Sequence, residues 1–175
     1  MNHDEHVGRG IVAGLAAGLV ASWVMNEFMM GPGQRLQQAV QSPEDNERDA
    51  IQSETPKEDA TMKTADAVVN TVTGGQHLSW EERKKSGPLV HYAFGGLIGA
   101  IYGGLAEQWP RVRSGFGTTF GSVLFTGADL FAVPAFGLGP SPTEQPTTAQ
   151  VSPCAAHLVY GVTTELVRRT ARALL

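Results

Sequence analysis

Residues 88–109 read PLVHYAFGGLIGAIYGGLAEQW, and this stretch decides the fold. It carries no Asp, Glu, Lys or Arg before Glu107, a length that at about 1.5 Å per helical residue nearly crosses the roughly 30 Å apolar layer of a bilayer. Gly95, Gly99 and Gly103 recur at every fourth position, so one helix face lacks side chains. Each interior glycine costs about 1 kcal/mol of helix propensity, a cost that close packing between membrane helices offsets. The stretch therefore predicts a membrane helix built for tight contact.

Three further apolar blocks give the chain its expected fold class, an all-α bundle of four transmembrane helices. We expect crossings at about residues 10–30, 88–107, 115–137 and 151–168, within one membrane domain covering residues 1–175. The second and third crossings are expected to pair as antiparallel neighbours through a short turn. The residues expected to pack the helices are small and mostly spaced by four positions, namely Gly10, Gly14, Gly18, Gly95, Gly99, Gly103, Gly117 and Gly121.

Composition excludes several other classes of protein. The hydrophobic fraction of 42% suggests a soluble chain until one sees that the apolar residues are segregated into blocks. The net charge of −4 and the lack of a basic stripe with interleaved aromatic residues argue against a nucleic-acid partner. The single cysteine, Cys154, excludes an intrachain disulfide. No G-x-S-x-G, P-loop, Rossmann or H-E-x-x-H motif is present, so we expect neither an enzyme nor a cofactor.

Residues 31–87 form a polar extramembrane connector between the first and second crossings. Within it, residues 55–72 predict a short amphipathic helix on the bundle or membrane surface, with Met62, Ala65, Val69 and Val72 along one stripe. Ser79-x-x-Glu82 has the pattern of a capping box that opens a helix leading into the second crossing. The connector is either a docking surface for a partner or a solvated linker, and the sequence leaves both open.

The distribution of basic residues predicts the orientation. With four crossings, both termini and the turn after the second crossing share one side, which holds Arg9, Arg111, Arg113, Arg168, Arg169 and Arg172. The positive-inside rule then places both termini in the cytoplasm. Residues 83–85, Arg-Lys-Lys, lie on the opposite side and oppose this assignment.

The second half of the chain resembles the YagU-like family of small bacterial inner-membrane proteins. The resemblance covers about residues 88–172, whereas the connector from Gln34 to Ser86 looks peculiar to this sequence. It rests on the order and spacing of His91, Tyr102, Gly103, Glu107, Pro110, Pro134-Ala135-Phe136-Gly137-Leu138-Gly139-Pro140, His157-Leu158-Val159-Tyr160-Gly161, Glu165, Arg168, Arg169 and Arg172. What it implies is an inner-membrane location with cytoplasmic ends, and it supplies no catalytic residue.

Four ionisable residues fall within the outer half of the predicted bundle: Glu27, His91, Asp129 and His157. Ionisable groups inside a bilayer are expensive, so each is a functional hypothesis. Together they could bind a transition metal or pass protons, or Asp129 and His157 could simply join two helices. Glu165 has a simpler explanation, because Arg169 four residues later gives an ion pair at the cytoplasmic surface.

Two classes of function follow. The first is a non-catalytic accessory or structural subunit, associated with other membrane subunits or with itself, because four short helices would leave one glycine face free for a partner. The second is a small transporter, channel or proton- or metal-binding protein that uses the four ionisable residues. Gly99→Leu would disrupt assembly under the first hypothesis, and Asp129→Asn would abolish flux under the second.

Overall fold

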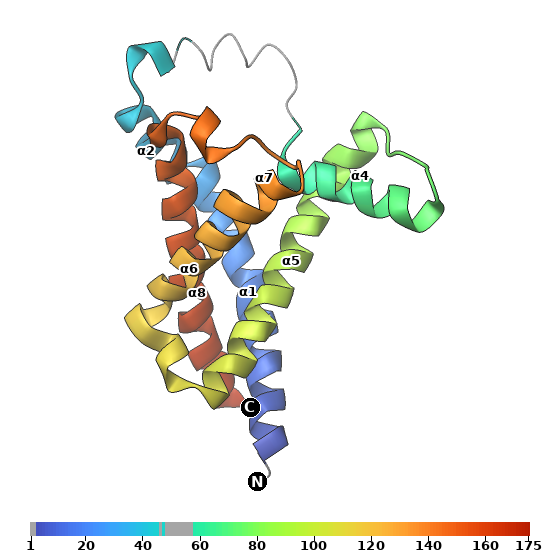
Figure 1. Cartoon of the computed structure of the whole chain (residues 1–175). Helices are drawn as coiled ribbons and strands as arrows, with labels where there is room; N and C mark the ends of the chain where they lie inside the picture. Colours follow the sequence, from blue (N-terminus) through green and yellow to red (C-terminus); the bar gives the residue numbers. More distant parts are fainter. Residues whose placement is uncertain (1–2, 46, 48–57) are drawn as a thin grey trace.

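The computed structural model describes residues 3–45, 47 and 58–175, and this part of the chain is all-helical, without a β-strand. Four long helical segments form the body of the molecule (Figure 1). They are α1 (His3–Met30), α5 (Trp80–Gln108), a third segment made of η1 (Pro110–Gly117), α6 (Thr118–Leu124), η2 (Phe125–Ala132) and α7 (Val133–Ala135), and α8 (Val151–Leu174). Shorter helices connect them, namely α2 (Pro32–Val40), α4 (Ala60–Thr73), η3 (Pro142–Glu144) and η4 (Thr147–Gln150).

Three segments of the described chain are long and apolar enough to cross a membrane. They are Glu5–Met30, Trp80–Gln108 and Pro110–Ala135. The fourth expected crossing, at 151–168, lies in α8, which is long enough but less apolar than these three segments. The all-α class is thus confirmed with three apolar helices, and a fourth crossing stays a prediction.

The distribution of side chains is reversed relative to a water-soluble bundle. Most core residues are small or polar, including Ala13, Ala17 and Thr164, all fully buried, and Met62 and Phe125 are the large apolar exceptions. Large apolar side chains point outward, as at Val12 (55% exposed) and Leu97 (57% exposed). Lipid tails are as apolar as these side chains, so such a surface suits a bilayer and would be costly in water.

Local sequence signals determine where α5 begins. Ser79 accepts a hydrogen bond from the Glu82 amide, and the Glu82 carboxylate accepts one from the Ser79 amide, which confirms the predicted capping box. The helix then continues through Pro88 without interruption to Gln108. It therefore begins eight residues before the predicted boundary at residue 88, because the cap rather than the start of the apolar run sets its first turn.

The third segment is less regular than the expected helix over 115–137. Its backbone leaves the helical region at Gly115 and Phe116, whose φ angles are 63° and 52°, so regular helix begins only at Thr118. Residues 125–132 form a π-helix, which widens the turn that carries Asp129. The segment is joined to α5 by a short turn as expected, but α6 packs its backbone on α8 rather than along α5.

The connector helix α4 lies across the start of α5 and projects sideways from the bundle (Figure 1). Met62 and Ala65 of the predicted apolar stripe are buried, whereas Val72 is 80% exposed. The helix begins at Ala60, behind an Asp59 cap that accepts a hydrogen bond from the Met62 amide. Residues 55–57, the start of the predicted amphipathic helix, lie outside the described residues.

Candidate functional site

A buried ionic cluster joins α5 and α8 near the chain termini. Glu165 is fully buried and accepts hydrogen bonds from Tyr102 Oη at 2.9 Å, Arg168 Nε at 2.8 Å and Arg169 Nε at 2.6 Å. The predicted pair with Arg169 is confirmed, but its expected place at the surface is wrong. Glu165 instead supplies the counter-charge that permits Arg168 to be buried.

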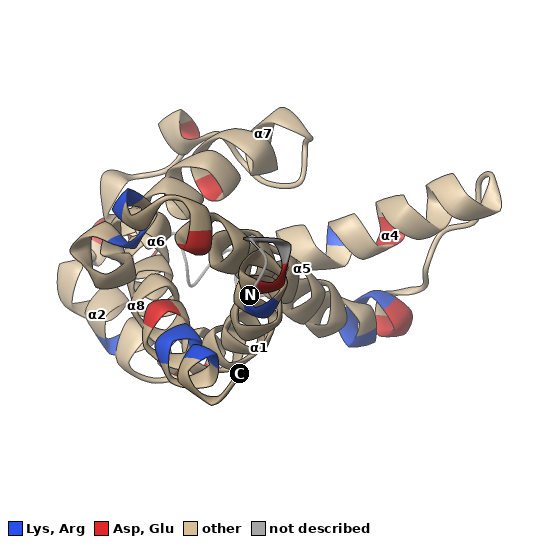
Figure 2. Cartoon of the chain, turned by 90° about the horizontal axis from the view of Figure 1, so that it is seen from below, with Lys and Arg blue, Asp and Glu red and all other residues tan. Residues whose placement is uncertain are grey.

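A second carboxylate extends this cluster to α1. Glu107 Oε1 lies 3.6 Å from Arg168 Nη1 and accepts a hydrogen bond from Arg172 Nε at 3.0 Å. Arg172 Nη2 in turn donates to His6 Nδ1 at 3.0 Å. Figure 2 shows Lys/Arg and Asp/Glu positions side by side along α8 at this end. These contacts fix the first turns of α1 against the last turns of α5 and α8.

Asp129 and His157 are the two members of the predicted ionisable layer that the structure brings together. His157 Nδ1 lies 2.9 Å from the Pro153 carbonyl oxygen and 3.7 Å from Asp129 Oδ2. Asp129 also lines a cavity of about 200 Å³, with Gln150 and Pro153 on its wall, between η2 and the start of α8. The pair therefore lies at ion-pair distance, beyond hydrogen-bond length, with Asp129 at the wall of this cavity.

Glu27 and His91 lie on other helices, α1 and α5. His91 Nε2 is 3.4 Å from the Ser22 carbonyl oxygen, where it links α5 to α1, and Glu27 is exposed. Across the described residues, no three His, Cys, Asp or Glu side chains are grouped to hold a metal ion. The structure thus pairs only Asp129 with His157, and the shared depth of the four residues stays a prediction.

The glycines of α1 and α5 lie where these two helices cross. A Cβ atom placed on Gly14 would be 2.8 Å from Gly103 Cα, and one on Gly99 would be 2.6 Å from Gly18 Cα. Gly10 and Gly95 continue the same contact along the two helices. Such distances leave no room for a methyl group, so the two backbones touch directly.

A second contact of this kind joins the third segment to α8. A Cβ on Gly117 would be 2.6 Å from the Gly161 carbonyl carbon, and one on Gly121 would be 2.9 Å from that of His157. Gly161 was not among the predicted packing residues. The expectation that one glycine face remains free for a partner is wrong for these residues, because each face is covered by another helix of the same chain.

Between α5 and the third segment lies an apolar groove that the sequence did not reveal. Its volume is about 560 Å³, and Phe94, Ile101, Val123 and Gly127 contribute to its walls. Tyr102 stacks on Phe120 with ring centroids 4.2 Å apart at its base. The groove exists because α6 packs along α8 and diverges from α5. No local pattern in the sequence specifies which of these helices α6 packs against.

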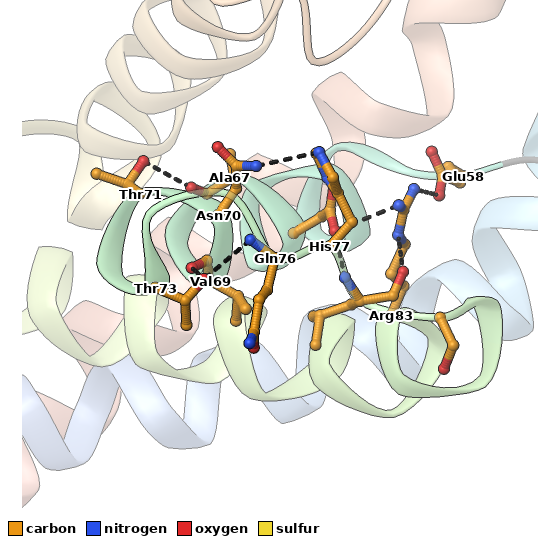
Figure 3. A network of polar contacts seen from close by, with 12 residues as sticks. Glu58, Ala67, Val69, Asn70, Thr71, Thr73, Gln76, His77 and Arg83 are labelled. Carbon is orange, nitrogen blue, oxygen red and sulfur yellow. Dashed lines mark hydrogen bonds and ion pairs between the residues drawn. The ribbon is translucent and has the colours of Figure 1, made fainter.

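A polar cluster outside the bundle fixes the α4–α5 hairpin (Figure 3). Asp66 accepts hydrogen bonds from His77 Nδ1 at 2.9 Å and from the Leu78 amide at 2.7 Å, and Arg83 Nη2 lies 3.2 Å away. Arg83 also pairs with Glu58. The hydrogen bond from His77 holds the pKa of Asp66 below its ordinary value. Because these charged groups form hydrogen bonds and ion pairs with one another, the cluster stabilises the α4–α5 hairpin.

Comparison with known proteins places more than half of the chain in one family. The model of the family described as "Protein of unknown function (DUF1440)" matches residues 68–166. No curated protein and no solved structure matches the chain. The matched region includes residues 68–86, so the expectation that the whole connector is peculiar to this sequence is wrong for that part. The resemblance to YagU-like proteins stays a prediction, and the chain belongs to the DUF1440 family.

Proposed function

We propose that this chain is a non-catalytic, multi-pass protein of the bacterial inner membrane, with four crossings and both termini in the cytoplasm. The observation that carries the proposal is the reversed distribution of side chains, with small and polar residues inside and large apolar residues outside. We further propose that it acts by binding within the membrane, as an accessory or structural subunit. No nucleic acid and no cofactor enter this proposal.

The proposed fourth crossing is α8. Its 24 residues span about 36 Å, and its two ends lie beside the two ends of α1. At one end Gln37, just after α1, donates to the Thr148 carbonyl oxygen, and at the other Arg172 reaches His6. The hydropathy of α8 is low because its polar residues form a buried stripe on the side that faces other helices.

The arginines at the end with the termini support the proposed orientation. Arg9 lies in the first turns of α1, Arg111 and Arg113 lie in η1 directly after α5, and Arg172 of α8 contacts both His6 and Glu107 at this end. On the opposite side, Arg83 is engaged by Glu58 and Asp66. The positive-inside rule counts basic residues in short loops next to the crossings, and this count favours the side that carries the termini.

Cysteine accessibility tests the topology sharply, because Cys154 is the chain's one cysteine and Cys154→Ala gives a cysteine-free background. Thr143→Cys, Ser114→Cys and Ala173→Cys then each add one probe at an exposed position. In intact cells we expect a membrane-impermeant maleimide to label only Thr143→Cys. Labelling of both Thr143→Cys and Ala173→Cys would show that α8 does not cross. Labelling of Ser114→Cys and Ala173→Cys without Thr143→Cys would invert the orientation.

The accessory role needs a surface, and the glycine faces cannot provide it because they are covered. The outward-facing side chains of α1 and α5, such as Trp23 and Phe94, are available instead. Extraction in a mild detergent followed by native mass spectrometry tests this role. Recovery with other subunits or as a homo-oligomer supports it, whereas a monomer in every detergent would contradict it.

The Asp129–His157 pair favours a second candidate function, the binding or passage of protons or cations. Asp129 lies beside both His157 and the adjoining cavity, so the charge of its carboxyl group acts electrostatically on both. Asp129→Asn should then abolish pH-driven dye quenching in proteoliposomes while the fold is retained. Glu27→Gln is the matched control, because Glu27 is an exposed carboxylate on a different helix, α1. Equal flux in wild type, Asp129→Asn and empty liposomes would exclude this function.

A further inference from the structure

We propose that the groove between α5 and the third segment holds one acyl chain of an anionic phospholipid, whose headgroup is bound at Arg111. The proposal rests on the membrane location proposed above. It names the occupant of the groove and the leaflet from which that occupant comes, the one on the side of the termini.

The shape of the groove favours a single chain over a protein partner. Its walls on α5 extend from Phe94 to Leu105, which at about 1.5 Å per residue gives about 17 Å. This length is close to one leaflet, about half of the roughly 30 Å hydrocarbon layer. A membrane-spanning helix about 10 Å wide and 30 Å long occupies on the order of 2,000 Å³. The groove, at about 560 Å³, is far too small for one.

The chemistry of the walls favours the same occupant. Apart from Arg111 and the hydroxyl-bearing Tyr102 and Thr119, the wall side chains are apolar. In the described structure, an ordered water or a polar ligand would find few partners along most of the groove. An acyl chain needs none, and each of its methylenes gains by contact with such walls.

Charge at the rim indicates which headgroup is preferred. Arg111 lines the groove and lies in η1, just after the end of α5 that Glu107 ties to Arg172 near the C-terminus, so it lies where headgroups of that leaflet would be. The arginines of α8 are engaged by Glu107 and Glu165. No carboxylate within the described part of the chain forms an ion pair with Arg111, and its guanidinium is therefore available to a phosphate.

Two substitutions test the two halves of the proposal. Gly127→Leu should fill the groove, because a Cβ at Gly127 meets no atom within 4 Å and Gly127 lies on the groove wall. Its matched control is Gly8→Leu, the same change at an exposed glycine with equally open surroundings outside the groove. Arg111→Gln should weaken headgroup binding, and Arg113→Gln, two positions away and not on the groove wall, is its control.

The measurement is native mass spectrometry of the full chain in detergent, titrated with phosphatidylglycerol or with phosphatidylcholine of identical acyl chains. We expect one phosphatidylglycerol per chain, about fivefold weaker binding in Arg111→Gln, and loss of the bound lipid in Gly127→Leu. Both control variants should bind as the wild type does.

Three results would overturn the proposal. Equal retention of the two lipids would refute the role of Arg111, and undiminished binding in Gly127→Leu would refute the groove as the site. A lipid-free dimer that Gly127→Leu dissociates would show that a second copy fills the groove. Alkaline carbonate extraction of the same membranes tests the proposed membrane location independently of lipid binding. A chain that resists extraction yet binds no lipid refutes only the lipid site.

Discussion

Replacing Gly99 by alanine tests the packing of α1 on α5 with the smallest possible change. The added methyl group would lie 2.6 Å from Gly18 Cα, whereas ordinary van der Waals contact begins at 3.4 Å, and the Gly14 carbonyl oxygen is nearer still. The helices must therefore move apart locally by about 1 Å for the Gly14 oxygen, 2.4 Å from the Cβ position, to reach ordinary contact at 3.4 Å. Overpacking of this kind typically costs about 1–3 kcal/mol, and it also weakens the neighbouring backbone contacts. We expect Gly99→Ala to lower the free energy of unfolding by that amount.

The assay is equilibrium unfolding in detergent micelles, followed by tryptophan fluorescence. Gly8→Ala is the control, because nothing lies within 4 Å of its Cβ position, and it should be neutral or stabilising by up to about 1 kcal/mol. Gly99→Leu should prevent folding of the monomer rather than separate subunits. If Gly99→Ala and Gly8→Ala unfold at the same denaturant concentration, the close contact between α1 and α5 does not stabilise the chain and the reasoning fails.

Two further predictions concern charged groups. Glu165→Ala should lower the free energy of unfolding by about 3–5 kcal/mol in the same assay, because Arg168 would stay buried without its main counter-charge. The double variant with Arg168→Ala should recover part of that loss. An unchanged free energy of unfolding in Glu165→Ala would contradict this prediction. Asp66 has a lowered pKa through its hydrogen bond from His77, so its contribution to stability is complete above its unfolded pKa of about 3.9 and is lost as the pH falls through the folded pKa. Hydrogen exchange of the Leu78 amide should accelerate over that range, relative to its intrinsic rate, in the wild type but not in Asp66→Asn.

Local signals in the sequence were sufficient for several elements. The Ser79–Glu82 capping box sets the start of α5, and both residues lie within one turn. The glycines at every fourth position of α5 indicate a face without side chains, and that face lies against α1. These features depend on residues close together in the chain, so a reader of the sequence can find them.

The choice of partner for each face depends on contacts between distant residues, which the sequence does not express locally. Gly117 and Gly121 of the third segment meet α8 rather than a partner protein, and the resulting divergence from α5 opens the groove. The burial of Glu165 was also missed, because its spacing to Arg169 explains the pair equally well at a surface. One signal was available: Ser152, Ala156, Tyr160 and Thr164 recur every four residues, and all of them are buried.

The buried polar stripe of α8 has a consequence for how the protein is made. In the proposed topology this helix follows the other three crossings out of the ribosome, and on its own it would expose Glu165 and Arg168 to lipid. Their partners, Tyr102 and Glu107, belong to α5, which is synthesised and inserted earlier. Biogenesis then has a fixed order: the translocon should release α8 efficiently only when α5 is already in place, and α8 fused alone to a reporter should insert poorly.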